Sequence, residues 1–525
     1  MLRSMGRHRR AGRALSIGAG AALALAGGAL TGASVQAATP DTPFGAVTVK
    51  PMGIEGNWGE RMAAAKYDYN GDGAGDVFVS ETADKRVFLL SGKQIGQPSQ
   101  ETNPLRIFKN PDKSAHGGSG FGSYISAVRD LTGDGKPELA VGVNRDGSRE
   151  VEVGSRWGSV YVFDGATGKL VHILDNPKPG TSELQQYHSQ FGGRIGDAGD
   201  LTGDNRSEVI VSASNASIRE SWDGQGRAYI FNGATGELHR TLDLPAADAE
   251  ACAARGETCR FGLSVQGPGD VDGDGVTDQL VNAGYWNGLQ GRSYLFSGKT
   301  GELIRRIDSP APEQNQAFFG FQDAAPLAPG DVNNDGHADI YQASFDQDGS
   351  EGRSQGKAWV FSGRELADGD PDEPYTTPLY ALNDPTPEYG GQFGWSMDKT
   401  DYNGDATPDI YVGQAPHHGV GSGSQGGTYV MNGANGSLHK VLELPETCEQ
   451  PPTRQNRSPA LGWSLAAPGD LNGDGDPDFV AGAPFFDIPQ GNNTWNRDQG
   501  MVFSFVSNPG SLPTPCTAED LGSGE

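Results

Sequence analysis

The sequence predicts an all-β protein, a seven-bladed β-propeller with four-stranded antiparallel blades. An acidic nine-residue loop recurs seven times, and its copies begin 61 to 70 residues apart. A short apolar run with the composition of a β-strand follows each copy. The 79 glycines and the absence of a convincing helical period agree with an all-β chain. A regular unit that holds four short strands is typical of a propeller blade.

Each unit has the same predicted order of elements. An aromatic–glycine pair such as Phe191-Gly192 opens a first strand, and the acidic loop joins it to a second strand, as in 207–213 (SEVIVSA). A variable stretch then leads to a third strand, such as 226–231 (GRAYIF), and a Gly-rich turn leads to a fourth. A linear β-solenoid is the main alternative, but its repeats are much shorter.

The two ends of the chain are expected to close the ring. The last unit supplies strands at 462–467, 478–483 and 501–506 but no fourth strand. An orphan strand at 44–49 (FGAVTV) precedes the first unit and can complete the last blade, which removes an open sheet edge. The propeller is therefore expected to occupy 38–508, with a Pro-rich tail at 509–525.

The acidic loops have the residue types of calcium sites. Oxygen-bearing side chains occupy positions one, three, five and nine, and Ca²⁺ takes about six to eight oxygen ligands in a loose geometry. The backbone carbonyl of position seven completes the expected set. In chain order, the residues at positions one, three, five, seven and nine are Asp68, Asn70, Asp72, Ala74, Asp76; Asp130, Thr132, Asp134, Lys136, Glu138; Asp200, Thr202, Asp204, Arg206, Glu208; Asp270, Asp272, Asp274, Val276, Asp278; Asp331, Asn333, Asp335, His337, Asp339; Asp401, Asn403, Asp405, Thr407, Asp409; and Asp470, Asn472, Asp474, Asp476, Asp478.

Turn chemistry is the alternative, because Asn-Gly and Asp-Gly favour tight turns without an ion. The acidic residue fixed at position nine favours the metal, since a turn alone does not need one. Position six requires a small residue, and Ala406 suits it less well than the Gly or Asn of the other loops. Up to seven Ca²⁺ ions are expected. Loop 270–278, with four carboxylates, should bind best, whereas 130–138, 200–208 and 401–409 depart most from the pattern.

The N-terminus has the pattern of a secretory signal peptide. Basic residues over 3–13 precede an apolar run rich in Ala, Leu and Gly, and Val35-Gln36-Ala37 supplies a cleavage site, so 1–37 is expected to be removed. An N-terminal membrane anchor is the alternative. No other segment is long and apolar enough to span a bilayer, so we expect a secreted protein without membrane insertion.

The net charge argues against two classes of binding partner, and the cysteine content indicates the compartment in which the protein works. A formal net charge of −27 repels nucleic acid and anionic membranes, so neither is an expected partner. Four cysteines in a secreted chain suggest two disulfides, for which three pairings are possible. Cys252 and Cys259 lie in one short insertion and are expected to pair, which leaves Cys448 for Cys516.

The motifs together resemble a known repeat. Aromatic–glycine pairs such as Phe393-Gly394 precede the acidic loops, the last unit carries Gly482-Ala483-Pro484, and 413–416 (GQAP) is close to it. This combination resembles the FG-GAP repeat of the N-terminal propeller of integrin α-subunits, over roughly 40–508. The resemblance implies a seven-bladed propeller with Ca²⁺ in hairpin loops. The predicted signal peptide and the chain length resemble those of a secreted bacterial relative, such as an actinobacterial one.

Strand parity assigns the connections to two faces. In an antiparallel four-stranded blade, the 1–2 and 3–4 connections emerge on one face and the 2–3 and 4–1 connections on the other. The acidic loops are 1–2 connections, so the long variable stretches are expected on the opposite face, where loops on a rigid scaffold carry function. Packing of the loop bases is the alternative role for the candidate ligand contacts there, which are Trp222, Tyr285, Trp286, His417, His418 and Trp495.

Three functions fit the sequence. The favoured one is a calcium-stabilised recognition or adhesion module that binds an extracellular protein or glycan by the variable face. The others are a carbohydrate lyase or hydrolase acting in the axial funnel, and a purely structural extracellular protein. The sequence has no GxSxG nucleophile elbow and no HExxH zinc motif, so no catalytic residue is assigned and a non-enzyme is expected.

Overall fold

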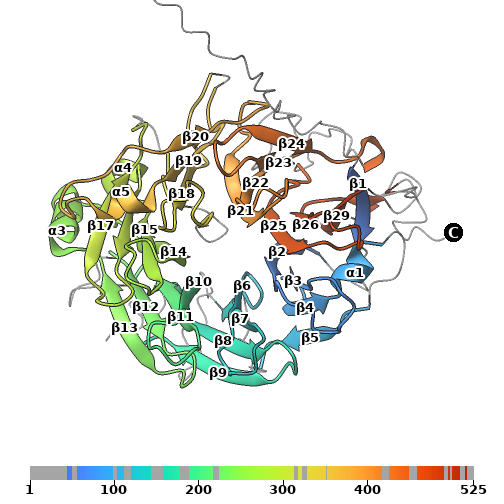
Figure 1. Cartoon of the computed structure of the whole chain (residues 1–525), viewed down its shortest axis with the longest axis horizontal. Helices are drawn as coiled ribbons and strands as arrows, with labels where there is room; N and C mark the ends of the chain where they lie inside the picture. Colours follow the sequence, from blue (N-terminus) through green and yellow to red (C-terminus); the bar gives the residue numbers. More distant parts are fainter. Residues whose placement is uncertain are drawn as a thin grey trace, which may run out of the picture. The chain divides into compact units, whose positions relative to one another are not determined.

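Seven β-sheets stand around a common axis in the unit Pro40–Glu525 (Figure 1). The structure is a computed structural model, and it describes residues 44–49, 56–97, 103–111, 120–143, 158–177, 189–216, 224–312, 317–321, 328–350, 352–416, 425–448, 458–489, 495–496, 499–508 and 515–516. The arrangement confirms the predicted seven-bladed propeller.

Within the described residues, six blades have four antiparallel strands and the fifth has three. From the first blade to the seventh, the strands are β2 (Trp58–Ala64), β3 (Val77–Glu81), β4 (Arg86–Leu90), β5 (Arg106–Lys109); β6 (Tyr124–Val128), β7 (Glu138–Val143), β8 (Ser159–Asp164), β9 (Leu170–Asp175); β10 (Phe191–Gly199), β11 (Glu208–Ala213), β12 (Arg227–Phe231), β13 (Leu238–Asp243); β14 (Phe261–Gly269), β15 (Asp278–Ala283), β16 (Arg292–Phe296), β17 (Leu303–Asp308); β18 (Ile340–Ser344), β19 (Lys357–Phe361), β20 (Tyr380–Leu382); β21 (Phe393–Thr400), β22 (Asp409–Gln414), β23 (Gly427–Met431), β24 (Leu438–Leu442); and β25 (Ser464–Gly469), β26 (Asp478–Ala483), β29 (Met501–Ser507), β1 (Phe44–Val49).

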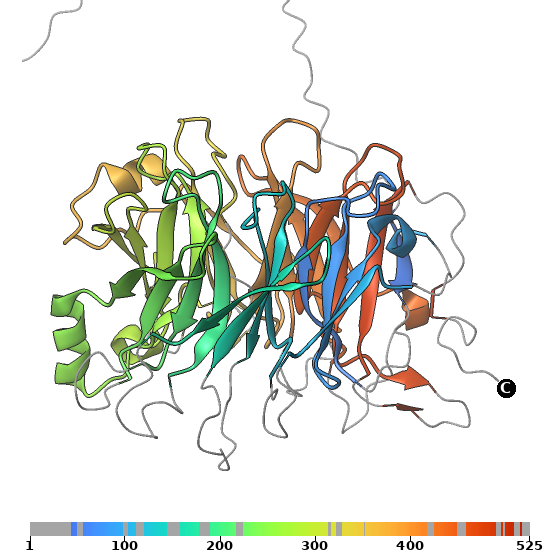
Figure 2. The same cartoon turned by 90° about the horizontal axis from the view of Figure 1, so that it is seen from below.

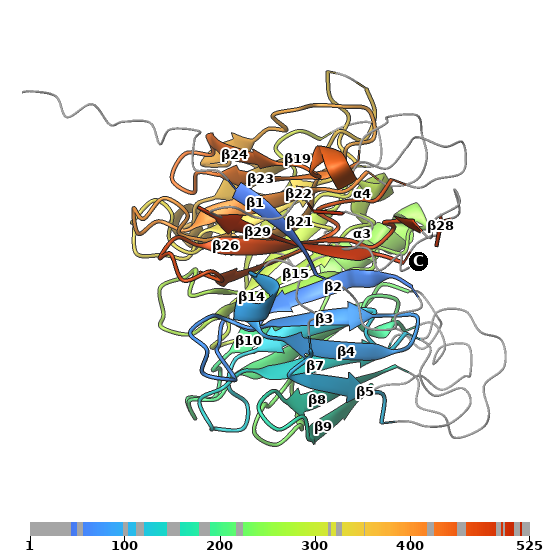
Figure 3. The same cartoon turned by 90° about the vertical axis from the view of Figure 1, so that its right-hand side faces the viewer.

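The ring is closed by the predicted N-terminal strand. β1 pairs antiparallel with β29, from Phe44 opposite Ser507 to Val49 opposite Val502. The sheet order β25–β26–β29–β1 places β1 at the outer edge of the seventh blade (Figure 3). The first and last strands of the described chain therefore share one blade, as the missing fourth strand of the last unit predicts.

The aromatic–glycine pairs hold neighbouring blades together. Phe261 is fully buried, and its ring centroid lies 5.5 Å from that of Tyr294 and 6.0 Å from that of Phe296. Its backbone also bridges to Gly226 in the preceding blade, where an added Cβ would lie 2.1 Å from the Phe261 carbonyl oxygen. The glycine that precedes the third strand is therefore required by close contact between blades.

One helix contradicts the expectation of a chain without a helical period. α3 (Ala246–Arg255) joins the third blade to the fourth, and six of its ten residues are alanine. Alanine has the highest intrinsic helix propensity, and Gly256 ends the helix in a left-handed conformation with φ 70°. The other helices among the described residues are short: α1 (Gly92–Ile95), α4 (Trp286–Leu289), α5 (Gly363–Ala367) and a 3₁₀ turn at Glu446–Cys448. In the described part of the chain, no helix is long and apolar enough to cross a bilayer.

The 3–4 connection of the fifth blade also differs from the expectation that these turns are short. It runs from residue 362 to 379 and begins with α5, on the same face as the acidic loops (Figure 2). Tyr375 then bridges to Ile307 of β17, and the Arg306 guanidinium reaches Asp372 at 3.2 Å. Variation in length is therefore present on both faces of the propeller.

Candidate metal centres and a cavity on the opposite face

The carboxylate at position one organises each acidic loop. In all seven loops it accepts a hydrogen bond from the backbone N–H of position six, at 2.7 to 2.9 Å. Position six has a positive φ in every loop, from 64° at Asn205 to 96° at Gly73. Ala406 adopts φ 70°, a conformation that costs a residue with a Cβ about 1–2 kcal/mol. The seven loops thus share one backbone shape, including the loop whose residue suits it least.

The acidic residue at position nine is buried in every loop. In the fourth blade, Asp278 accepts hydrogen bonds from the N–H groups of Val271 and Asp272 at 2.9 and 3.0 Å, and from Gly298 in the 3–4 turn at 3.0 Å. Burial raises the pKa of Asp278 to about 7 and that of Glu138 to about 7. In this blade, position nine therefore ties the acidic loop to the next turn. This is a structural use of the carboxylate, and it corrects the premise that only a metal needs an acid there.

The second and third acidic loops differ from the others at both position three and position nine, where they carry Thr and Glu. Thr132 donates a hydrogen bond to Glu138 at 3.0 Å, and Thr202 donates one to Glu208 at 3.3 Å. The longer glutamate reaches across to the hydroxyl of position three, while its other oxygen still accepts from the backbone of position two at 2.6 Å in both loops. The Thr and Glu of these loops are a matched pair that keeps the shared loop shape.

Carboxylate oxygens from three positions lie within 4.8 Å of one another in the first, second and fourth loops. Two ligands of one Ca²⁺ lie at most about 5 Å apart, because Ca–O distances are about 2.3–2.6 Å. All of the potential ligand atoms in these loops are oxygens, including those of carboxylates and backbone carbonyls. Oxygen ligands are those that a hard cation prefers. The residues therefore fit Ca²⁺. The clusters are Asp68, Asp72 and Asp76; Asp130, Asp134 and Glu138; and Asp270, Asp272 and Asp278.

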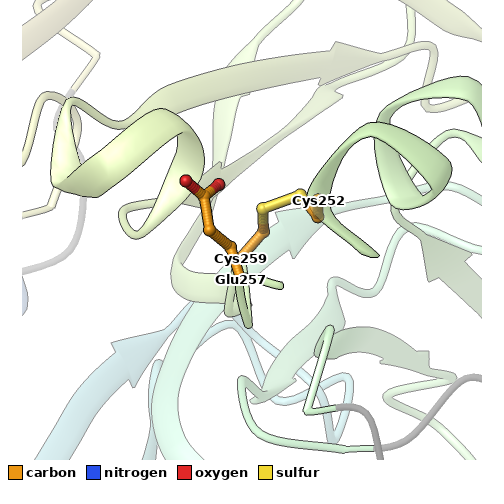
Figure 4. Close-up of side chains that lie close together, drawn as sticks. All are labelled: Cys252, Glu257 and Cys259. Atoms are coloured by element: carbon orange, nitrogen blue, oxygen red, sulfur yellow. A yellow bond between two sulfur atoms is a disulfide. The ribbon is translucent and has the colours of Figure 1, made fainter. Parts of the chain in front are cut away.

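A further close group of potential metal ligands is explained by a disulfide. Cys252, Glu257 and Cys259 lie together (Figure 4), but the two sulfur atoms are bonded to each other and offer no thiolate. The second disulfide joins Cys448 to Cys516 in the tail. Both pairings are those that the sequence analysis expected.

On the face opposite the acidic loops, two of the candidate ligand contacts can be placed. Trp286 is buried, with the guanidinium carbons of Arg255 and Arg292 at 4.5 and 4.2 Å from its ring centroid. This environment fits the packing alternative. Tyr285 is partly exposed, and the Arg260 guanidinium lies 4.4 Å from its ring centroid. The other candidates lie outside the described residues: Trp222, His417, His418 and the side chain of Trp495, whose backbone belongs to β28 (Trp495–Asn496), paired with β27 (Ile488–Pro489).

A cavity of about 490 Å³ opens beside Tyr285. Its walls include residues beside the aromatic–glycine pairs of neighbouring blades, such as Arg194, Arg260 and Phe318. These residues were not predicted from the sequence, because they lie outside the long connections. One sequence feature could have pointed to them. The residue immediately before each aromatic–glycine pair varies from blade to blade, whereas the pair that follows it repeats. In chain order these residues are Asn57, Gly120, Gln190, Arg260, Phe318, Gln392 and Ala460.

Comparison with known families matches residues 461–502 to the FG-GAP repeat. These residues contain β25, the acidic loop 470–478 and β26. This segment of the seventh blade is similar to the FG-GAP repeat. The acidic loop recurs in the other six blades, and the described sheets form a seven-bladed propeller, so the architecture resembles that of an FG-GAP propeller.

The similar curated proteins include integrin α-subunits and a phospholipase D. Integrin alpha pat-2 of Caenorhabditis briggsae is 31% identical over 229 residues, which is 41% of this chain and 17% of the relative. Integrin alpha-7 of Homo sapiens is 31% identical over 166 residues, 31% of this chain and 12% of the relative. Phosphatidylinositol-glycan-specific phospholipase D of Rattus norvegicus is 30% identical over 224 residues, 41% of this chain and 24% of the relative. The match spans a quarter or less of each of these relatives, so it shows a similarity to part of each protein and no activity.

Proposed function

We propose that this protein is a secreted, calcium-binding FG-GAP propeller that acts as an extracellular recognition module. Ca²⁺ fixes the acidic face, and the opposite face binds a protein or glycan ligand. The observation that carries the proposal is the convergence of three carboxylates within 4.8 Å in each of three loops. Bundled carboxylates repel one another, so each such loop is stabilised by a bound cation.

The role of Ca²⁺ in this proposal is structural. Asp270, Asp272 and Asp278 would hold the ion in the fourth loop, and the ion would supply the positive charge that the loop lacks. Asp278 also accepts a hydrogen bond from Gly298 in the 3–4 turn. Binding at this loop therefore stabilises the connection between two hairpins of the blade, and the free energy of binding adds to that of folding.

The opposite face supports recognition because it combines a cavity with partly exposed aromatic and cationic side chains. Tyr285, Arg260 and Phe318 line the same cavity of about 490 Å³, a size within the range that holds small ligands. Aromatic and arginine side chains are enriched where proteins bind their partners. Two disulfides and the predicted signal peptide support an extracellular location.

Binding of the mature protein to an array of glycans and extracellular proteins, in Ca²⁺ and in chelator, tests the proposal. We expect binding that requires Ca²⁺ and is lost in Tyr285→Ala. The matched control is Tyr389→Ala, because Tyr389 is 43% exposed and is not among the residues that line the cavity. Binding that survives Tyr285→Ala, or binding to no member of the array, contradicts recognition through this face.

A further inference from the structure

The cavity beside Tyr285 is a cationic pocket in a strongly acidic protein. The Arg194 guanidinium carbon lies 4.6 Å from the ring centroid of Tyr124 and 5.6 Å from that of Phe321. The Arg260 guanidinium lies 4.4 Å from the ring of Tyr285. Stacking on an aromatic face fixes the plane of a guanidinium. Arg194 also donates a hydrogen bond from Nη1 to the Gly193 carbonyl oxygen at 2.6 Å. The positive charge of such a pocket favours an anion locally, although the net charge of the whole protein is −27.

Two polar groups in the cavity wall lack partners among the described residues. Within that part of the chain, the Arg260 guanidinium has no ion pair, and its buried Nε has no hydrogen-bond acceptor. Ser212 is 1% exposed and its hydroxyl is likewise without a hydrogen bond to described residues. A buried polar group left unsatisfied costs about 1–3 kcal/mol. Both residues line the cavity, so a ligand with acceptor atoms would lie beside them.

The position of Arg260 in the repeat explains how such a pocket arises. The residue before the aromatic–glycine pair has a positive φ in every blade, including 54° at Gln190, 52° at Arg260 and 51° at Phe318. This backbone shape belongs to the fold, since all seven blades share it. The side chain is not fixed by the fold, and Gln190, Arg260 and Phe318 meet in one cavity. Ligand specificity can therefore be set at this position without disturbing the blades.

We propose that this cavity binds an acidic sugar, one that carries a carboxylate, with Arg260 and Arg194 as its charged contacts. The proposal rests on the recognition function above and names the ligand class. A guanidinium pairs with a carboxylate by two parallel hydrogen bonds. Ser212 and Gln190 offer hydrogen bonds to hydroxyl groups, and Tyr285 offers an aromatic face to the apolar side of a sugar ring.

Other ligand classes use less of the cavity. A neutral sugar leaves the Arg260 guanidinium without a charged partner. An inorganic anion leaves the aromatic wall of Tyr285, Phe318 and Phe321 without a contact. An acidic peptide side chain pairs with arginine but presents no ring of hydroxyl groups to Ser212 and Gln190. A uronate satisfies the charged, hydroxyl and aromatic parts of the wall together.

Isothermal titration tests the proposal with four probes: galacturonate and glucuronate tetrasaccharides, a neutral galactose tetrasaccharide, and a tetraglutamate peptide. We expect at least one uronate to bind the wild-type protein about tenfold or more tightly than the neutral sugar or the peptide. Arg260→Gln should weaken that binding about tenfold or more, and Arg260→Lys should weaken it less. Arg364→Gln is the matched control, because Arg364 is 59% exposed and lies in α5 on the acidic face.

Melting temperatures of all variants separate loss of binding from loss of folding. If Arg260→Gln lowers the melting temperature, Tyr285→Ala provides a second variant of the same wall, and it should weaken uronate binding because it removes the aromatic face. Uronate binding that Arg260→Gln leaves unchanged in a folded protein overturns the proposal, as does equal or tighter binding of the neutral sugar or the peptide. Absence of uronate binding also overturns it. The recognition function then stands if the array finds another ligand that Tyr285→Ala abolishes, and it fails if the array finds none.

Discussion

The two faces of the propeller are made from the same seven repeats but use them differently. On the acidic face, the Asp at position one and the buried acid at position nine make equivalent backbone contacts in every blade. On the opposite face, the backbone before each aromatic–glycine pair also repeats, yet its side chain changes from Gln190 to Arg260 to Phe318. One face keeps its side chains because they hold the fold together. The other is free to vary them, and that is where a specific ligand can be recognised.

Removal of Ca²⁺ should produce the largest effect and should act on the acidic face. Saturation of one site at a hundred times its dissociation constant contributes about 2.7 kcal/mol, so three occupied loops contribute about 8 kcal/mol. We expect chelator to lower the melting temperature by roughly 10 °C. Differential scanning calorimetry measures this. Arg260→Gln, on the other face, should show the same shift, and an identical melt in Ca²⁺ and chelator contradicts the structural role.

Loss of one loop site should have a smaller effect. Asp270→Ala combined with Asp274→Ala removes two predicted ligands and the carboxylate that accepts from Gly275 at 2.9 Å. We expect the free energy of unfolding in Ca²⁺ to fall by about 3 kcal/mol. Denaturant unfolding measures the change. Asp368→Ala is the control, because its side chain is 80% exposed and belongs to no acidic loop. Equal stability of the double variant and the control would remove this site from the account.

A partly buried acid on the opposite face should respond to pH and not to Ca²⁺. Asp384 follows β20 and accepts a hydrogen bond from Gln414 at 2.9 Å. Burial, with the nearby charge of Glu388, raises the pKa of Asp384 to about 6 from its ordinary value of 3.8. The folded state therefore binds more protons than the unfolded state between these values, so the free energy of unfolding falls as pH rises through this window.

Between low and neutral pH, the free energy of unfolding of Asp384→Asn should fall by about 1 kcal/mol less than that of the wild type. This value allows for solvent screening of a partly exposed group. The measurement is urea unfolding of wild type and variant at pH 4, 5, 6 and 7, in Ca²⁺ and in chelator. Parallel pH profiles for the two proteins would show that Asp384 is not the group responsible. A difference that appears only in Ca²⁺ would break the separation between the faces.

The smallest predicted effect is a gain of stability in the sixth loop. Ala406 has φ 70°, whereas five of the other loops have glycine at this position. Ala406→Gly should raise the free energy of unfolding by about 1 kcal/mol, because glycine adopts this conformation without a Cβ penalty. The reverse change at the equivalent position, Gly475→Ala (φ 92°), should lower it by a similar amount. Thermal melts of the two variants check the pair, and changes of the same sign would contradict a shared loop shape.

The fold could be predicted because its determinants repeat. Seven copies of the acidic loop set the number of blades, and the strand at 44–49 matched the missing strand of the last unit. α3 could not be predicted from a repeat, because it lies in an insertion present in one blade and forms through local alanine propensity.

The site was harder to predict because proximity across blades is not visible in the chain. Arg194 and Arg260 are 66 residues apart in sequence, but they line one cavity because both lie at the start of a first strand. Position nine showed the opposite difficulty: its acid was read as a metal ligand, and its hydrogen bonds to the following turn, such as Asp278 to Gly298, emerged only in three dimensions.

Equilibrium titration of Ca²⁺ into the chelator-treated protein measures whether the acidic loops bind the ion. We expect several bound ions per chain, at least one for each loop with three converging carboxylates, and one ion fewer in the Asp270→Ala/Asp274→Ala variant. Arg260→Gln should bind the same number of ions as the wild type. Absence of stoichiometric Ca²⁺ binding, or an unchanged number of ions in the loop variant, would contradict the assignment of the acidic face to calcium.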